Sequence, residues 1–400
     1  MRITLLLGTT LLAWSLRTPW LQARRSPAVL RINPSSVTAA IKKSASYAPD
    51  PRALNGMLTK TTSARELLEL HAQYGSVFDH VNLATCWSRL GRVRAGGERR
   101  WLLSDGGARL GDLREQTSER VRRFDARGLS STAHALAKLS LRGTAWASLW
   151  NDIERAALAR RRKFEPMALA TTAWAFATAD HAAPALFEAI AEEATGRMRD
   201  FDAQALTNTA WAFATAGHAA PALFKAIAEE AAGRVREFKP QGLANTAWAF
   251  AKEGHAASAL FDAIAEEAAG RVCECNAQNL ANTAWAFATA GRAAPALFDA
   301  IAKEAAGRMS DFTPQQLANT AWAFAKTGHA APALFDAIAE EAAGRARELT
   351  PQNRANTVWA FVTAGHAAPA LFEAITAGAA GRVREVEPQN LANTASGLRQ

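Results

Sequence analysis

The sequence predicts an all-α protein, an α-solenoid of stacked helical hairpins that each span 37 residues. The first observation is a fixed period, because six full copies of one unit occupy residues 168–389 and a seventh begins at Asn390. The second is that each copy holds two segments with apolar residues at helical spacing, separated by glycine or proline. A period of this length is typical of proteins whose units bury their apolar faces against their neighbours. A tryptophan marks it, at Trp174, Trp211, Trp248, Trp285, Trp322 and Trp359.

The first helix of a unit is expected to begin at a Thr-Pro-Gln or Lys-Pro-Gln signal. In the copy that contains Trp322, Thr313 is a good N-cap, and Pro314 at the first helical position loses no helical hydrogen bond. Phe324 lies at helical spacing on the apolar face. Gly328 stands where the helix should end, a usual place for a left-handed residue.

The second helix of this copy is expected to begin at Pro332. Its alanines are strong helix formers and allow neighbouring helices to approach closely. The predicted inward residues are Leu334, Phe335, Ile338 and Ala342, and the predicted outward residues are Asp336, Glu340 and Glu341.

Residues 1–49 are expected to be an organellar targeting presequence. They contain seven Lys or Arg and no Asp or Glu. The apolar run Ile3–Ser15 is shorter than the roughly 20 residues of a membrane helix, so no membrane association is expected. A secretory signal would share this run, and a bipartite plastid signal would share all of these features. The Arg- and Ser-containing, acid-free continuation favours import into a mitochondrion or plastid, and which organelle stays open.

Residues 50–163 are predicted to hold diverged copies of the same unit, with the array beginning near Ser63. His134 stands at the tryptophan position, 40 residues before Trp174. The stretch 82–87 resembles 279–285 with one residue fewer. The Gly- and Arg-rich stretch 94–107 is expected to be a loop. The regular repeats then occupy residues 164–400, and the last is incomplete.

Charge is unevenly distributed along the chain, whose formal net charge is +9. Up to Lys163 there are 28 basic and 12 acidic residues, and from Phe164 onward there are 18 basic and 25 acidic. The regular array is therefore not a basic rod, which argues against strong non-specific binding of nucleic acid.

Arginines gather at the end of each second helix, where the stacked repeats would align them in a column. The column could bind phosphates, or the cations could complement the helix C-terminus. Its members are Arg120, Arg122, Arg160, Arg162, Arg197, Arg199, Arg234, Arg236, Arg271, Arg308, Arg345, Arg347, Arg382 and Arg384.

A second column lies on the polar face of the first helix, where amides and hydroxyls recur at spacings of three, four and seven residues. Such groups can meet base edges as a one-base-per-repeat RNA reader requires, or they can cap helices and bond to loops. The starting position varies and includes Gln316 and Asn279. The positions that follow include Asn208, Asn245, Asn282, Asn319, Asn356, Lys252 and Lys326.

The tryptophans themselves are expected in the core, beside Leu, Ala and Phe, rather than as platforms for stacked bases. Histidines also recur once per repeat, as at His329 and His366. Because they lie in separate layers, they are expected to be helix-end residues and not metal ligands. Three cysteines set no disulfide framework, and the isolated pair Cys273 and Cys275 is weak evidence for a metal. No catalytic or cofactor-binding motif stands out, so we expect a non-enzyme without a cofactor.

The pattern Pro-Gln-x-Leu-Ala-Asn-Thr-Ala-Trp-Ala-Phe-Ala, followed by Gly and by Pro-Ala-Leu-Phe-Asp-Ala-Ile, resembles octotricopeptide and heptatricopeptide repeat proteins. These are related to the FAST kinase-like family, and the likeness covers about residues 63–400. The resemblance implies sequence-selective binding of organellar RNA, with effects on transcript stability, processing, translation or ribosomal RNA maturation. It would place RNA contacts at the first-helix polar column. Many relatives end in a RAP domain, and nothing similar precedes Gln400.

The sequence therefore predicts an organellar solenoid that binds single-stranded RNA, with other RNA-processing proteins as further partners, and is not itself an enzyme. The predicted contact residues are Asn208, Asn245, Asn282, Asn319, Asn356, Lys252, Lys326, Gln316, Arg199, Arg234, Arg236, Arg271, Arg308, Arg345 and Arg382. One alternative is a protein-binding scaffold of the same fold, which the acidic balance of the array favours. Another is an RNA-processing subunit whose catalytic RAP-like domain lies outside this sequence.

Overall fold

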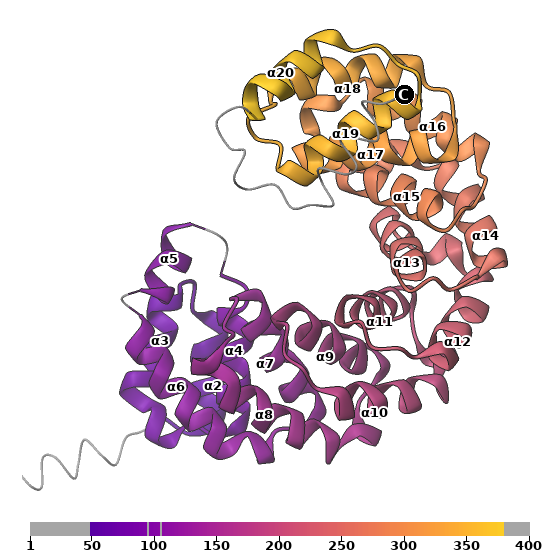
Figure 1. Ribbon diagram of the computed structural model, residues 1–400. Helices are drawn as coiled ribbons and strands as arrows, with labels where there is room; N and C mark the ends of the chain where they lie inside the picture. Colours follow the sequence, from indigo (N-terminus) through magenta and orange to yellow (C-terminus); the bar gives the residue numbers. More distant parts are fainter. Residues whose placement is uncertain (1–48, 94–95, 105, 380–400) are drawn as a thin grey trace, which may run out of the picture. The chain divides into compact units, whose positions relative to one another are not determined.

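A computed structural model describes residues 49–93, 96–104 and 106–379, and every regular element in this part of the chain is helical (Figure 1). The elements form hairpins of a first and a second helix. The first helices are α2 (Pro51–Lys60), α4 (His80–Leu90), α7 (Ala126–Lys138), α9 (Pro166–Ala179), α11 (Ala203–Ala216), α13 (Pro240–Lys252), α15 (Ala277–Thr289), α17 (Pro314–Thr327) and α19 (Pro351–Thr363). The second helices are α3 (Ala64–Tyr74), α6 (Gly107–Arg120), α8 (Thr144–Leu158), α10 (Pro184–Thr195), α12 (Pro221–Ala232), α14 (Ser258–Ala269), α16 (Pro295–Ala306), α18 (Pro332–Gly344) and α20 (Pro369–Ala379).

The hairpins stack in sequence order, which confirms the α-solenoid. Each first helix packs against the first helices before and after it, and the second helices do the same in a layer of their own (Figure 1). The first helices approach one another more closely than the second helices do. Their buried alanines explain this, because small side chains let helix backbones come together. We call the solvent-facing side of the first layer the first-helix face.

Local signals set the ends of the helices as the sequence predicts. Thr313 caps α17, where its hydroxyl accepts a hydrogen bond from the Gln316 backbone N–H at 3.3 Å. Gly328 ends the helix in the left-handed region, with φ 66°. The second helix α18 begins at Pro332, as expected. The predicted inward residues of α18, namely Leu334, Phe335, Ile338 and Ala342, are all buried.

Aromatic contacts between neighbouring repeats join the layers. The ring of Phe298 in α16 meets the ring of Phe324 in α17 edge to face, with 4.9 Å between centroids. The equivalent pair one repeat later, Phe335 and Phe361, is at 5.0 Å. Such pairs add specific geometry to the burial of apolar area, so each repeat has one defined position against the next.

Short 3₁₀ turns connect the second helices from α3 to α16 to the next repeat. They are η1 (Gly75–Val77), η2 (Val121–Arg123), η3 (Arg161–Lys163), η4 (Met198–Asp200), η5 (Val235–Glu237), η6 (Val272–Glu274) and η7 (Met309–Asp311). A buried aromatic residue usually follows the turn, for example Phe238 and Phe312. It places the N-cap of the next first helix immediately afterwards.

The N-terminal part corrects three expectations. Within the described residues the array already includes α2, whose N-cap is Asp50, so it extends further toward the N-terminus than Ser63, which caps α3 instead. The stretch expected to be a loop contains a helix, α5 (Gly97–Leu103), and residues 94–95 and 105 within it are outside the described part.

The third correction concerns the register of α4. Asp79 is its N-cap and Asn82 completes a capping box, so Asn82 matches Asn279 of α15 without a deletion. Trp87 therefore falls one position before the repeat tryptophan. It is fully buried, and its indole N–H donates to the Thr117 hydroxyl at 2.8 Å.

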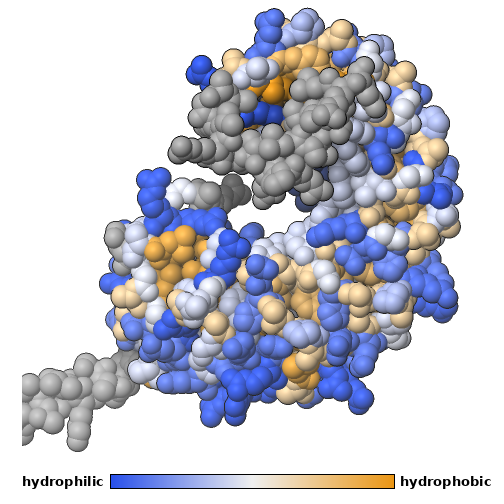
Figure 2. All heavy atoms as spheres, viewed as in Figure 1, coloured by the Kyte–Doolittle hydropathy of each residue, from blue (hydrophilic) through white to orange (hydrophobic). Residues whose placement is uncertain are grey.

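Within the described residues, no helix is both long enough and apolar enough to cross a membrane. The visible surface of the second helices α8, α10 and α12 is mostly hydrophilic (Figure 2).

Candidate functional site

Four positions of each regular first helix lie together on the first-helix face. In α15 they are Gln278, Asn282, Trp285 and Thr289, at spacings of four, three and four residues, which keep side chains on one side of a helix. We call the full set the polar–aromatic strip. It continues as Gln204, Asn208, Trp211 and Thr215 in α11; Gln241, Asn245, Trp248 and Lys252 in α13; Gln315, Asn319, Trp322 and Lys326 in α17; and Gln352, Asn356, Trp359 and Thr363 in α19.

The asparagine side chains of the strip are half-buried, and within the described residues no intramolecular hydrogen bond engages them. The glutamines one turn earlier are exposed. An amide offers two donor hydrogens and one acceptor oxygen, so each repeat presents unused hydrogen-bonding groups of both kinds. The glutamine column was missed by sequence reasoning, although the recurrent Pro-Gln pair was a signal for it.

The tryptophans form a ladder on the same face. The ring centroids of Trp174 and Trp211 are 6.1 Å apart, those of Trp211 and Trp248 6.5 Å, and those of Trp248 and Trp285 6.5 Å. The rings are only half-buried, so the expectation that they belong to the core is wrong in part. One side of each ring packs on the core, and the rest remains open to a partner.

The ladder leaves no room for a base between two of its rings. A base inserted between parallel rings needs about 7 Å, twice the stacking step of a nucleic-acid strand. The centroid spacing of 6.1–6.5 Å is smaller. A ligand would therefore lie over the exposed ring edges beside the amides.

Two neighbouring groups set the electrostatics of the strip. The Lys252 ammonium lies 5.0 Å from the centroid of the Trp248 ring, a cation–π contact at an exposed position. At the tryptophan position of α7, the His134 ring lies 5.2 Å from that of Trp174. Desolvation, with a smaller contribution from the Lys138 charge, lowers the pKa of His134, so this ring is neutral at neutral pH.

Three adjoining grooves run along the first-helix face. The first, of about 560 Å³, lies over α2, α4 and α7, and the second, of about 590 Å³, lies between α7 and α9. The third, of about 400 Å³, covers α9, α11 and α13 and is lined by Asn208 and Asn245. Arg127 lines the first two grooves, and Thr171 lines the last two. The grooves thus join the N-terminal repeats to the strip.

The position that was expected to start the polar column has a structural role instead. Gln316 lies in the first turn of α17, and its side-chain oxygen accepts from the Thr313 backbone N–H at 2.9 Å, closing a capping box. Asn279 and Asn353 occupy the same position and are buried. Gln316 is therefore not part of the strip, and its neighbour Gln315 is.

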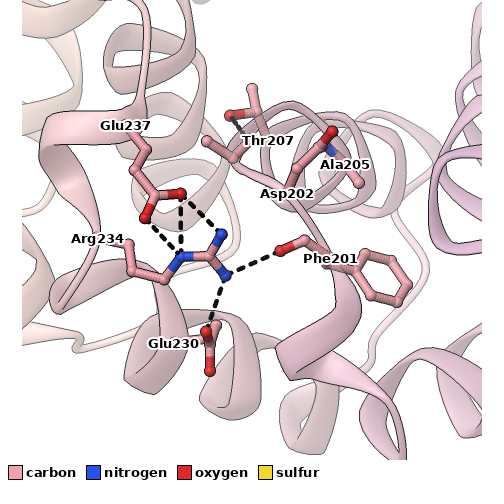
Figure 3. Close-up of polar contacts among 8 residues, drawn as sticks. Phe201, Asp202, Ala205, Thr207, Glu230, Arg234 and Glu237 are labelled. Carbon is pink, nitrogen blue, oxygen red and sulfur yellow. Dashed lines mark hydrogen bonds and ion pairs between the residues drawn. The ribbon is translucent and has the colours of Figure 1, made fainter.

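The first arginine of each pair also holds the fold together (Figure 3). The Arg234 guanidinium donates to the Phe201 carbonyl of the preceding repeat at 2.9 Å, to Glu230 at 2.9 Å and to Glu237 at 2.7 Å. We call this arrangement the arginine staple. It recurs at Arg197, Arg271, Arg308 and Arg345.

The staple gives several arginines of the predicted phosphate column other partners. Each guanidinium of Arg234, Arg271, Arg308 and Arg345 is paired with two carboxylates, so a phosphate would have to displace one of them. Hydrogen bonds from Arg234 and Arg271 lower the pKa of Glu237 and Glu274 respectively. Arg199 and Arg236 are exposed instead, and no ion pair engages them within the described residues. Arg382 lies outside those residues.

The histidines lie at helix ends, as expected. His329 follows the C-cap Gly328, and its ring hydrogen-bonds Asp299 of the preceding repeat at 2.8 Å. Within the described residues, no group of three or more His, Cys, Asp or Glu side chains is placed to hold a metal ion. Burial raises the pKa of the Cys275 thiol to about 11.

A stacked-hairpin scaffold with a strip of unused amides and aromatic edges is an α-solenoid with a candidate binding face. A comparison with known protein families matches residues 112–273 and 258–399 to the RNA-editing substrate-binding complex 6 protein family. The chain belongs to this family, and the expectation of a helical-repeat family linked to RNA metabolism is confirmed at that level. The narrower resemblance to octotricopeptide and heptatricopeptide repeats is not tested by this match. No curated protein shows significant similarity to the chain.

Proposed function

We propose that the chain binds single-stranded RNA along the polar–aromatic strip and acts in RNA metabolism as a binding component, without catalysing a reaction. The observation that carries this proposal is the strip itself, in which unused amides alternate with half-exposed indole rings in each first helix from α11 to α19. Membership of a family described as substrate-binding in RNA editing supports it.

The chemistry of the strip fits unpaired bases better than a duplex. Single strands are recognised by hydrogen bonds to base edges and by contact with aromatic side chains. A repeat offers both within one helix, for example at Asn282 and Trp285. Successive rings about 6 Å apart give a spacing on the scale of one extended nucleotide per repeat.

Charge in the array supports base contacts over a continuous phosphate track. The staple arginines are neutralised by carboxylates, and the exposed cations of the strip are confined to Lys252 and Lys326. Binding at the strip should therefore depend on hydrogen bonds and aromatic contact more than on ionic strength.

We further propose that the protein acts inside an organelle, with a mitochondrion favoured, and that residues 1–49 direct its import. The basic, acid-free composition of those residues supports this, although they lie outside the described structure. A role in transcript processing, stability or translation, in contact with other RNA-processing proteins, follows as the finer form of the proposal.

The test is a variant that removes three amides of the strip, Asn282→Ala, Asn319→Ala and Asn356→Ala. A net hydrogen bond is worth about 0.5–1.5 kcal/mol, so we expect the affinity for a pool of single-stranded RNAs to fall at least about tenfold. The readout is the dissociation constant from fluorescence anisotropy.

A matched control carries Glu192→Gln, Glu266→Gln and Glu340→Gln, three exposed positions on second helices. It should bind RNA at least as well as the wild type. Equal binding by the wild type and the asparagine variant would overturn the placement of the site, and no binding by the wild type at low salt would overturn RNA binding itself and favour a protein-binding scaffold.

A further inference from the structure

The arginine staple changes its charge pattern in the N-terminal repeats. In the regular repeats the staple arginine has a Glu four residues before it and an Asp or Glu three residues after it, as at Arg234 and Arg271. At Arg160 these two positions hold Ala156 and Lys163, and at Arg120 they hold Gln116 and Arg123.

The connection to the preceding repeat is nevertheless retained. Arg120 donates to the Phe78 carbonyl, and Arg160 donates to the Arg122 carbonyl. Each arginine thus still bonds a carbonyl of the preceding repeat, although the acceptor of Arg160 lies within η2 and not at the aromatic residue that follows it. Both neutralising carboxylates are missing. In both repeats the position three residues after the arginine has changed from an acid to a cation, and the position four residues before it has become uncharged.

These changes gather cations along η2 and η3. Within the described residues no ion pair engages the exposed side chains concerned, and their number in these two turns and the first turn of α7 gives a local positive potential. They are Arg122, Arg123, Arg127, Arg161, Arg162 and Lys163.

The groove between α7 and α9 opens into this cluster. Arg123, Arg127, Arg160 and Lys163 line it, against two acidic residues, Asp125 and Glu165. Asp125 accepts the Gly128 backbone N–H at 2.7 Å as the N-cap of α7, and Glu165 lies 3.8 Å from Arg197. Both carboxylates therefore have other partners, and the cations dominate the groove.

The same groove is continuous with the strip. Met167 and Thr171 line it and also line the neighbouring groove that contains Asn208. Thr171 occupies in α9 the position that asparagine occupies in the regular repeats. A strand lying on the strip would reach this basic groove at the N-terminal end.

We propose that the groove between η2–α7 and η3–α9 binds the phosphodiester backbone of the RNA and supplies the electrostatic part of the affinity. This inference rests on the proposed function, because it assigns the backbone and the bases of one strand to different repeats. Arg123, Arg127 and Lys163 bind phosphates whatever the sequence, and the strip meets the bases.

The test is the variant Arg123→Glu with Lys163→Glu. It installs the acid found at the same position of the regular repeats, where it pairs with the staple arginine, so the fold is expected to tolerate it. In the control, Lys225→Glu with Lys303→Glu, the same change of charge is made at exposed positions of α12 and α16, where other repeats also carry an acid.

Dissociation constants are measured across a salt series for a single-stranded RNA and for an abasic strand of the same length. Each lost phosphate contact lowers the slope of log K against log salt by roughly 0.7, so the groove variant should lose at least about 1.4. Its affinity should fall for both strands, while the control keeps the slope of the wild type. Circular dichroism and thermal melting verify that each variant is folded.

A groove variant whose salt slope equals that of the wild type would overturn the inference. If the asparagine variant still loses RNA binding in that case, the proposed function stands. An equal decrease of the salt slope in the control would also overturn the inference, because the change of net charge would then explain the effect without the groove. Absence of RNA binding by the wild type would overturn both.

Discussion

At the scale of single residues, one arginine per repeat joins three elements. The Arg271 side chain bonds Glu267 of α14 at 3.0 Å, Glu274 of η6 at 3.0 Å and the Phe238 carbonyl of the preceding repeat at 2.9 Å. About a quarter of this side chain is exposed, so solvent screens the ion pairs in part. The bond to the buried connection is what the fold depends on.

We therefore expect Arg271→Ala to destabilise the junction of α13, α14 and α15 by about 1–3 kcal/mol, since the carbonyl and two carboxylates lose a charged donor. Arg271→Lys should recover only part of this, because an ammonium cannot replace the planar fork of donors. Amide hydrogen exchange of the three helices measures the local free energy of opening. Arg236→Ala, which removes an exposed arginine outside the staple, is the control and should change little.

The staple also predicts a dependence on pH. The hydrogen bond from Arg271 lowers the pKa of Glu274 below its ordinary 4.5. A group whose pKa is lower in the folded state contributes its stability fully above the unfolded value and loses it as the pH falls through the folded value. The junction should thus weaken below pH 4.5 in the wild type, and this loss should be smaller in Arg271→Ala. An equal loss in both proteins would contradict the role of the pair.

At the scale of elements, each first helix from α7 to α19 ends at a left-handed residue. Glycine fills this position in the regular repeats, as Gly217 does with φ 63°. In α9 the residue is Asp180, with φ 55°. A side chain is strained in this region, so Asp180→Gly should raise the stability of the α9–α10 hairpin by up to about 1 kcal/mol. Gly217→Ala should lower the stability of the α11–α12 hairpin by a similar amount. Urea unfolding of both variants measures whether the free energy of unfolding rises in the first and falls in the second.

The elements also show how far the sequence reaches. Thr313, Pro314 and Gly328 act within one or two turns, so the ends of α17 could be predicted from them. The partial exposure of Trp285 could not, because it depends on how neighbouring first helices stack. The staple of Arg271 joins it to a carbonyl 33 residues earlier, which no local pattern reveals. Its acids four residues before and three residues after were nevertheless a readable signal.

At the scale of the whole array, the described repeats divide into two chemical regions. The N-terminal connections carry unbalanced cations at Arg123 and Lys163. In the regular repeats an acidic residue stands at the same position and forms an ion pair with the staple arginine. Along the regular repeats the first helices present nearly identical side chains, so the strip would read a strand of repetitive composition. The proposed RNA would therefore contact many equivalent positions and gain affinity from their number.

The most direct measurement is ultraviolet cross-linking of the purified protein to a single-stranded RNA, with the attached peptides identified by mass spectrometry. Binding at the polar–aromatic strip predicts cross-links on first helices, above all on peptides that contain Trp248, Trp285 and Trp322. Peptides from the second helices of the same repeats should carry no cross-links. Cross-links concentrated on α12, α14 and α16, with none on α13, α15 and α17, would contradict the proposed site.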